Sequence, residues 1–112
     1  MKKIKVNIKD SIADTLFITL FAKAVESEKS NPLISDKVAC ELVKTIDYDF
    51  SKYKNKKRSL VGVSIRSSHF DNSVKQFIEN HKNPVVVLVG CGLDSRIQRL
   101  GKVAEKAIFY EL

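Results

Sequence analysis

Apolar residues recur every three or four positions near the start of the chain, and this spacing predicts an amphipathic helix. The stripe comprises Ile12, Leu16, Phe17, Leu20, Phe21, Ala24 and Val25. Ser11 is placed to cap this helix, because Asp14 follows three residues later, as in a capping box. The polar residues 26–31 and Pro32 then predict a connection. We interpret the stripe as a core face, with a membrane-surface or partner-binding helix as the alternative.

Two further helices are predicted before residue 84. The second begins near Ser35 or Asp36, and Cys40 lies off its apolar face. That face consists of Val38, Ala39, Leu42, Val43 and Ile46. A longer helical segment covers residues 59–81, and its apolar face consists of Val63, Phe70, Val74, Phe77 and Ile78. Helical spacing of this kind predicts that both faces pack against a core.

Arg66 interrupts the pattern of the third helix. It lies four residues before Phe70, near the inner edge of the predicted core face. A buried cation destabilises a fold unless it is paired. Two interpretations follow, namely a salt bridge to a nearby acid such as Asp71, or a clamp for a ligand carboxylate.

The pattern changes in the last quarter of the chain. Residues 85–89 are a continuous aliphatic run, which predicts a strand covered on both faces, as in a parallel sheet. Gly90 and Gly92 end the run, and glycines there allow positive φ and close approach of a ligand to the backbone. A short helix with Gly101 as its C-cap follows, and residues 106–112 read as a second strand.

Strand, glycine turn, helix and strand are the opening of a nucleotide-binding βαβ unit. The acidic residue of its second strand is Glu111, 21 positions after Gly90. A carboxylate at about this spacing, at the tip of the second strand, reaches the hydroxyls of a ribose. The sequence therefore predicts an α/β protein, with a helical N-terminal region over residues 1–83 and the start of a nucleotide-binding domain over residues 84–112.

Composition changes this picture little. The chain has 112 residues, of which 44% are hydrophobic and 29% charged, as in an ordinary small soluble domain. The longest apolar stretch, residues 16–24, is interrupted by Lys23 and is shorter than the ~20 residues of a membrane span. The N-terminus lacks the apolar segment of a signal peptide. Two cysteines, Cys40 and Cys91, make no disulfide framework, and we expect a reducing cytoplasm.

No metal site is predicted. Asp47 and Asp49 have no third ligand at a recognisable spacing, and we interpret them as solvated turn residues. His69 and His81 lack Cys, His or carboxylate neighbours at metal-ligand spacing, and both are expected at the surface.

Charge raises one alternative function. The net charge is +7, and residues 52–58, KYKNKKR, hold five cations in seven positions. Such a run attracts nucleic acid. Only Tyr53 lies inside it to stack on a base, and no motif of the common RNA- or DNA-binding folds accompanies it. We favour a solvated loop, and nucleic-acid binding stays a less favoured alternative.

Four segments, in chain order, resemble a known family. They are TLFITLFAKAVESE, NPLISDKVACELVKTIDYDFSKY, VGVSIRSSHFDNSVKQFI and VVLVGCGLDSRIQRL. Together they are similar to the N-terminal half of the leucine carboxyl methyltransferase and polyketide O-methyltransferase family, which uses S-adenosylmethionine (SAM). The resemblance runs from about residue 15 to residue 112. Its most specific parts are the IR..HFD segment at residues 65–71 and the GCGLDSR turn at residues 90–96.

The resemblance implies roles for individual residues. Gly90 and Gly92 match the glycines of the family's SAM loop, and Arg66 matches the arginine that holds the methionine carboxylate of SAM. Glu111 matches the acid that ends the second strand. Asp94 and Arg96 also match the motif; we place Asp94 among the cofactor-binding residues. No catalytic residue is identified.

The residues themselves favour SAM over a dinucleotide. The third motif position of a dinucleotide loop is Gly or Ala, whereas here it is Ser95. Asp94 puts a negative charge beside the would-be anion site, which would repel a pyrophosphate and tolerate a sulfonium with its ammonium group.

The expected function is therefore that of the N-terminal part of a SAM-dependent O-methyltransferase with a Rossmann-like fold. Its acceptor would be a carboxylate or hydroxyl of a small or polyketide-like molecule. The alternative is a noncatalytic helical fragment or interaction module. Because the family continues beyond this second strand, we expect an incomplete sheet and a truncated chain that is inactive alone. Its apolar strand edge predicts self-association or a complementing C-terminal half.

Overall fold

The computed structural model describes residues 3–5 and 10–112. Its elements in chain order are β1 (Ile4–Lys5), α1 (Asp10–Ser27), α2 (Lys37–Thr45), β2 (Ile46–Asp47), the 3-10 helix η1 (Phe50–Tyr53), α3 (Lys57–Asn80), β3 (Val85–Leu88), α4 (Arg96–Leu100), the 3-10 helix η2 (Gly101–Lys106) and β4 (Ile108–Glu111). The predicted α/β class, with helices first and a strand, turn, helix and strand unit last, is confirmed.

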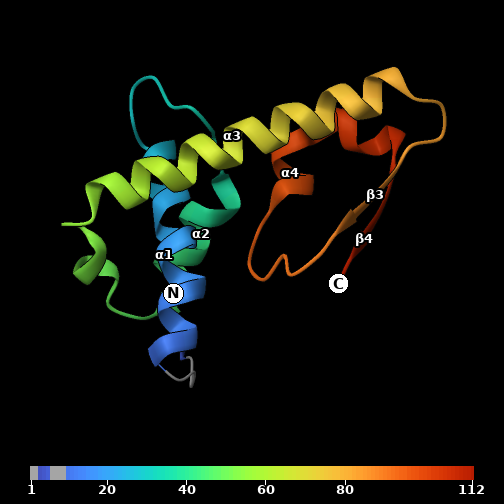
Figure 1. Ribbon diagram of the computed structural model, residues 1–112. Helices are drawn as coiled ribbons and strands as arrows, with labels where there is room; N and C mark the ends of the chain where they lie inside the picture. Colours follow the sequence, from blue (N-terminus) through green and yellow to red (C-terminus); the bar gives the residue numbers. More distant parts are fainter. Residues whose placement is uncertain (1–2, 6–9) are drawn as a thin grey trace.

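The long helix α3 joins the two ends of the molecule. Figure 1 shows α1 and α2 beside the first half of α3, and β3, β4 and α4 beside its second half. The molecule is accordingly elongated, with extents of 44 × 30 × 27 Å. Residues far apart in the chain therefore meet along one helix.

The N-terminal core forms around α1. Phe17, Leu20 and Phe21 are buried as the stripe predicts, whereas Ile12, the first member, is half exposed. Phe17 packs 4.5 Å from Tyr48, and Phe21 stacks on Phe50 at 5.9 Å between ring centroids. The helix continues through Ser27, two residues into the predicted connection. The proposed cap at Ser11 lies outside the side chains that the structure describes.

The second helix begins where the sequence predicts. Asp36 is its N-cap, and its carboxylate accepts a hydrogen bond from the backbone N–H of Ala39 at 2.9 Å. Ala39 is fully buried. Cys40, predicted off the apolar face, is instead half buried against the core, and burial raises the pKa of its thiol. A two-residue parallel pair, β1 with β2, was not predicted from the pattern.

The third helix is confirmed, and Ile78 of its predicted apolar face is buried, but the rest of its buried face differs from the predicted one. Phe70 and Phe77 are 49% and 41% exposed. The buried positions are Leu60, Ser64, Ser67 and Ile78. Serines are small enough for α1 to approach closely, and the Ser64 hydroxyl lies 3.5 Å from the Ala22 carbonyl oxygen. Small residues thus form the part of α3 that packs on α1, and Phe70 and Phe77 lie outside this contact.

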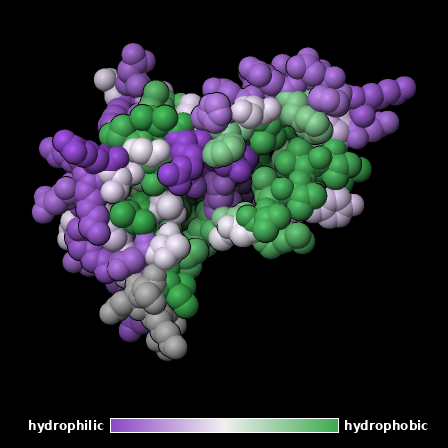
Figure 2. Space-filling view, viewed as in Figure 1, coloured by the Kyte–Doolittle hydropathy of each residue, from purple (hydrophilic) through white to green (hydrophobic). Residues whose placement is uncertain are grey.

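The last two strands pair in parallel, as predicted, and their register joins Val85 to Ile108 and Leu88 to Glu111. The prediction that the first strand is covered on both faces is wrong. Leu88 is buried, but Val85 and Val87 are about half exposed, because only one face of this two-stranded sheet packs on helices. The uncovered side is an apolar surface, here called the exposed sheet face, and Figure 2 shows it as a continuous green patch over β3 and β4. It consists of Val85, Val87, Val89, Ile108, Tyr110 and Leu112.

Candidate functional site

A pocket of about 560 Å³ lies between α1, α3 and the turn that follows β3. Its volume is typical of small-molecule sites, which measure roughly 300–1,000 Å³. Three of the predicted site residues, Arg66, Gly90 and Asp94, meet here. The full lining is Thr19, Lys23, Val63, Arg66, Ser67, Leu88, Val89, Gly90, Cys91, Asp94 and Arg96.

The glycine turn has the backbone conformation that the sequence predicts. Gly90 and Gly92 have φ of +61° and +52°, values that residues with a side chain rarely adopt. Gly90 lines the pocket, so a ligand can approach its backbone. Gly92 does not line it; a Cβ there would come within 3.0 Å of the Leu16 Cδ2 atom. Gly92 therefore lets the turn pack against α1.

Arg66 is an unpaired cation at the pocket. Within the described part of the chain, its guanidinium makes no ion pair or hydrogen bond, and its side chain is exposed rather than near a buried face. The salt bridge to Asp71 is absent, because Asp71 pairs with Arg96 and Arg99 instead. The salt-bridge interpretation of Arg66 is therefore wrong for the described residues, and the clamp for a ligand carboxylate stays a prediction.

Asp94 is held by three cations. Its Oδ1 atom lies 2.8 Å from Lys23 Nζ and 2.7 Å from Arg99 Nη1, and its Oδ2 atom lies 3.6 Å from Arg96 Nη2. Burial alone would raise the pKa of Asp94, but the hydrogen bonds from Lys23 and Arg99 outweigh it and lower the pKa to about 2. The negative charge of Asp94 is thus compensated. It does not by itself repel an anion, and this part of the argument against a dinucleotide is corrected.

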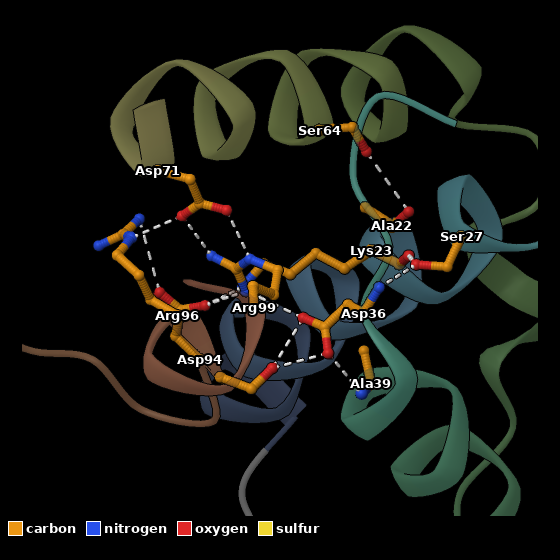
Figure 3. A network of polar contacts seen from close by, with 11 residues as sticks. Ala22, Lys23, Ser27, Asp36, Ala39, Ser64, Asp71, Asp94, Arg96 and Arg99 are labelled. Atoms are coloured by element: carbon orange, nitrogen blue, oxygen red, sulfur yellow. Dashed lines mark hydrogen bonds and ion pairs between the residues drawn. The ribbon is translucent and has the colours of Figure 1, made fainter. Parts of the chain in front are cut away.

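Asp94 belongs to a larger cluster that we call the ion network, drawn in Figure 3. It consists of Asp36, Asp71, Asp94, Lys23, Arg96 and Arg99. Arg99 is its centre: Nε lies 2.7 Å from Asp71, and Nη1 lies 2.9 Å from Asp36. The network holds three carboxylates and three cations of balancing charge, and Arg66, which also lines the pocket, stands outside it.

Ser95, the third position of the glycine motif, joins this cluster. Its hydroxyl lies 2.7 Å from each carboxylate oxygen of Asp36 and donates to them. Both residues are nearly inaccessible to solvent. The serine that departs from a dinucleotide loop thus connects the turn to the N-cap of α2, and makes no capping bond to α4.

Glu111 lies apart from the pocket lining. It ends β4 opposite Leu88, and its side chain is exposed. The strand ends are nevertheless adjacent, because the backbone N–H of Gly90 donates to the Leu112 carbonyl at 3.1 Å. Glu111 therefore stands at the carboxyl edge of the sheet beside the glycine turn, where ligands of parallel sheets bind.

Sequence reasoning missed Lys23 as a site residue. It lines the pocket and is only 7% exposed, although it is a lysine. The sequence did contain a signal for it, because a single lysine inside the apolar stripe of α1 must either be exposed or pair with an acidic side chain. Lys23 pairs with Asp94, which lies 71 positions later in the chain.

The basic run has a structural role. Lys52 pairs with Asp14 at 3.1 Å and lies over the ring of Tyr48, and α3 begins at Lys57. Tyr53, the aromatic residue inside the run, is only 2% exposed, and burial raises the pKa of its hydroxyl. A buried ring cannot stack on a base, so the nucleic-acid alternative loses its aromatic contact.

Other classes of site find no support in the described residues. No three His, Cys, Asp or Glu side chains gather in a metal-binding group. Among the same residues, no helix combines the length and the apolar character needed to cross a membrane.

Comparison with known proteins places this arrangement in a family. The model of the leucine carboxyl methyltransferase family matches residues 17–112. The tetracenomycin polyketide synthesis O-methyltransferase TcmP of Streptomyces glaucescens is 35% identical over 89 residues, which are 80% of this chain and 33% of that protein. The S-adenosyl-L-methionine-dependent methyltransferase dpfgK of Gibberella zeae is 34% identical over 97 residues, which cover 78% and 32%.

The chain thus spans about a third of the length of these curated relatives. No solved structure matches it significantly. The resemblance stated from the four segments is confirmed, and the name of the second relative includes the cofactor that was expected. The chain belongs to the leucine carboxyl methyltransferase family.

Proposed function

We propose that this chain is the cofactor-binding N-terminal part of a SAM-dependent O-methyltransferase. The observation that carries the proposal is the meeting of unpaired Arg66 with the Gly90 turn in one pocket, at the carboxyl end of a parallel strand. Two relatives named as methyltransferases support it. In this proposal β3, α4, η2 and β4 are the first unit of a Rossmann-like sheet.

Each predicted site residue then has a task. Arg66 binds the methionine carboxylate of SAM through charge-assisted hydrogen bonds. Gly90 lets the cofactor approach the backbone, and Gly92 keeps the turn packed on α1. Glu111 accepts hydrogen bonds from the ribose hydroxyls. Asp94 acts through the ion network, holding the turn in place rather than contacting the cofactor as a free carboxylate.

Bound SAM supplies a methyl group that is already activated by its sulfonium. When bound, SAM would donate this methyl group to an oxygen of the acceptor. The protein's part is to align the two reactants and exclude water. We propose a small-molecule acceptor with a carboxylate or hydroxyl, of which only the hydroxyl needs a general base.

We further propose that this chain needs additional protein to turn over an acceptor. Its exposed sheet face carries six apolar residues, and unpaired strand edges and apolar faces are templates for association. A complementing C-terminal part would cover this face and supply the acceptor pocket, and without it a second copy of the chain would associate there.

Calorimetry with SAM and S-adenosylhomocysteine tests the proposal on the 112-residue chain. We expect both to bind, and the melting temperature to rise further as the ligand concentration increases. Arg58→Ala is the matched control for the site variants, because Arg58 is also an exposed arginine of α3 but lies outside the pocket. Absence of heat and of any thermal shift with either ligand would favour the noncatalytic alternative.

A further inference from the structure

We infer that Asp36, in the N-terminal helical region, is a positioning residue for the cofactor turn, acting through Ser95 and Arg99. The inference rests on the proposed function, since it concerns the same pocket. Asp36 precedes the turn by more than 50 residues and does not line the pocket. Its effect on a ligand would therefore be indirect.

The first support is the number of hydrogen-bond donors that the buried carboxylate of Asp36 accepts from. Asp36 accepts from the Ala39 N–H at 2.9 Å, from the Ser95 hydroxyl at 2.7 Å and from Arg99 Nη1 at 2.9 Å. It is 1% exposed. An ionised carboxylate at this depth is stable only when paired and fully hydrogen-bonded, so its partners have little freedom to move.

The second support is the geometry of Arg99. Its side chain is 4% exposed and contacts carboxylates from three separate places: Asp36 before α2, Asp71 in α3 and Asp94 in the turn. The contact with Asp71 is bidentate, through Nε at 2.7 Å and Nη2 at 2.9 Å. A planar guanidinium holds such an arrangement in one orientation, which a lysine ammonium does not.

These contacts fix the position of the turn relative to Arg66, the residue proposed to bind the cofactor. Asp71 lies on the same helix as Arg66, five residues later, so α3 carries both the free cation and an anchor of Arg99. Arg99 and Ser95 in turn hold the segment that follows Gly90. The distance between Arg66 and the Gly90 backbone therefore depends on the ion network, and a displacement of about 1 Å is enough to weaken a binding site.

The contacts of Asp36 also join the two predicted parts of the molecule. The pairs of Asp36 with Ser95 and Arg99 cross the predicted boundary between residues 83 and 84. The N-terminal helices then act as a structural part of the cofactor site rather than as a separate cap over it.

The test is SAM binding by Asp36→Asn and Ser95→Ala. Asparagine caps a helix as well as aspartate does, so the first variant keeps α2 and removes the charge that holds Arg99. We expect SAM affinity to fall about tenfold for Asp36→Asn and severalfold for Ser95→Ala. The backbone amide signals of Gly90 and Gly92 should shift in the nuclear magnetic resonance spectra of both variants without ligand.

Glu26→Gln is the matched control. Glu26 is likewise a buried carboxylate of the N-terminal helices, bonded to Lys29 and to the Leu33 N–H, but it does not contact the turn. We expect it to leave SAM affinity and the glycine signals unchanged. An equal loss of affinity in this variant would overturn the inference, because it would show a general effect of stability.

Two outcomes separate this inference from the proposed function. If the wild-type chain does not bind SAM, the proposed function fails, and the shift of the glycine signals still decides whether Asp36 positions the turn. If the wild type binds SAM and the variants bind it equally well with unmoved glycine signals, the inference fails alone. Should Asp36→Asn not fold, Ser95→Ala decides, because it removes one hydroxyl and no charge.

Discussion

The N-terminal helices and the C-terminal strands use apolar residues in opposite ways. In the first region the aromatic side chains are enclosed: Phe17 and Tyr53 are only 1% and 2% exposed. In the second, Val87 and Ile108 are 51% and 57% exposed. Both segments have the apolar pattern of their secondary structure. An apolar repeat in the sequence therefore gives a helix or strand an apolar face, but that face is buried only where a second layer of the molecule covers it.

The difference also shows what holds the strands in place. Leu88, on one side of the sheet, is buried and lines the pocket with residues of α1 and α3, and the ion network joins the turn after β3 to the helices. Polar contacts thus help to hold the strand unit on the helices, while the N-terminal helices have their own apolar core. Mutations in the two regions should therefore differ in kind as well as in size.

The largest effect is expected from the aromatic core. Phe17→Ala should lower the free energy of unfolding by about 3–5 kcal/mol, because it removes a fully buried ring that packs on Tyr48 and Phe50. Urea denaturation followed by circular dichroism measures this change. A loss below about 1 kcal/mol would mean that the N-terminal region has no well-packed core, and would remove the contrast between the two regions.

The next effect concerns binding. Arg66→Ala should weaken SAM binding by about 2–4 kcal/mol, because a charge-assisted pair with the ligand carboxylate is lost. Since Arg66 is exposed and has no partner within the described residues, the stability of the free chain should stay within about 0.5 kcal/mol of the wild type. Isothermal calorimetry measures the affinity. Unchanged affinity in the folded variant would remove Arg66 from the site.

These predictions rest on parts of the fold that local signals determine. The start of α2 was predictable because the cap Asp36 and its partner Ala39 are three residues apart. The positive φ of Gly90 followed from the residue type at the end of an aliphatic run. In both cases the physical cause lies within a few residues of the effect.

The features that escaped prediction depend on distant partners. Arg99 and Asp36 are 63 positions apart, so no local pattern identifies them as a pair. Which face of α3 is buried depends on where α1 approaches it, and α1 lies against Ser64 rather than against Phe70, which spacing alone does not reveal. The same reason explains Val87: its exposure depends on whether another layer covers the sheet. The pocket could be predicted at Arg66 and Gly90 by resemblance, but the network that holds it could not.

A smaller effect should follow from acid. The pKa of Asp94 is lowered to about 2 by Lys23 and Arg99, from an ordinary value of 3.8. A depressed carboxyl pKa stabilises the fold at pH above the ordinary value, and this stabilisation is lost as the pH falls toward the folded-state value. We expect a loss of about 1–2 kcal/mol between pH 4 and pH 2, because partial exposure of the group reduces the full effect.

Thermal melts of Asp94→Asn across this pH range provide the check. The variant should be less stable than the wild type at pH 7, and the difference should shrink toward pH 2 as the wild-type carboxylate becomes protonated. A difference that stays constant with pH would show that the charge of Asp94 does not stabilise the fold.

The smallest effect on stability is expected on the exposed sheet face, and it gives the sharpest test of the comparison. Val87→Thr keeps the β-branched shape and replaces a methyl group by a hydroxyl at a position that is 51% exposed. In dilute solution the free energy of unfolding should change by less than about 0.5 kcal/mol, as for other surface positions. At higher concentration the wild type should associate through this face, so its melting temperature should rise with concentration more than that of the variant. Light scattering measures the association directly. The contrary result would be that the wild type and Val87→Thr are both monomeric and melt at the same temperature at every concentration. The exposed sheet face would then be stable in water without a covering layer.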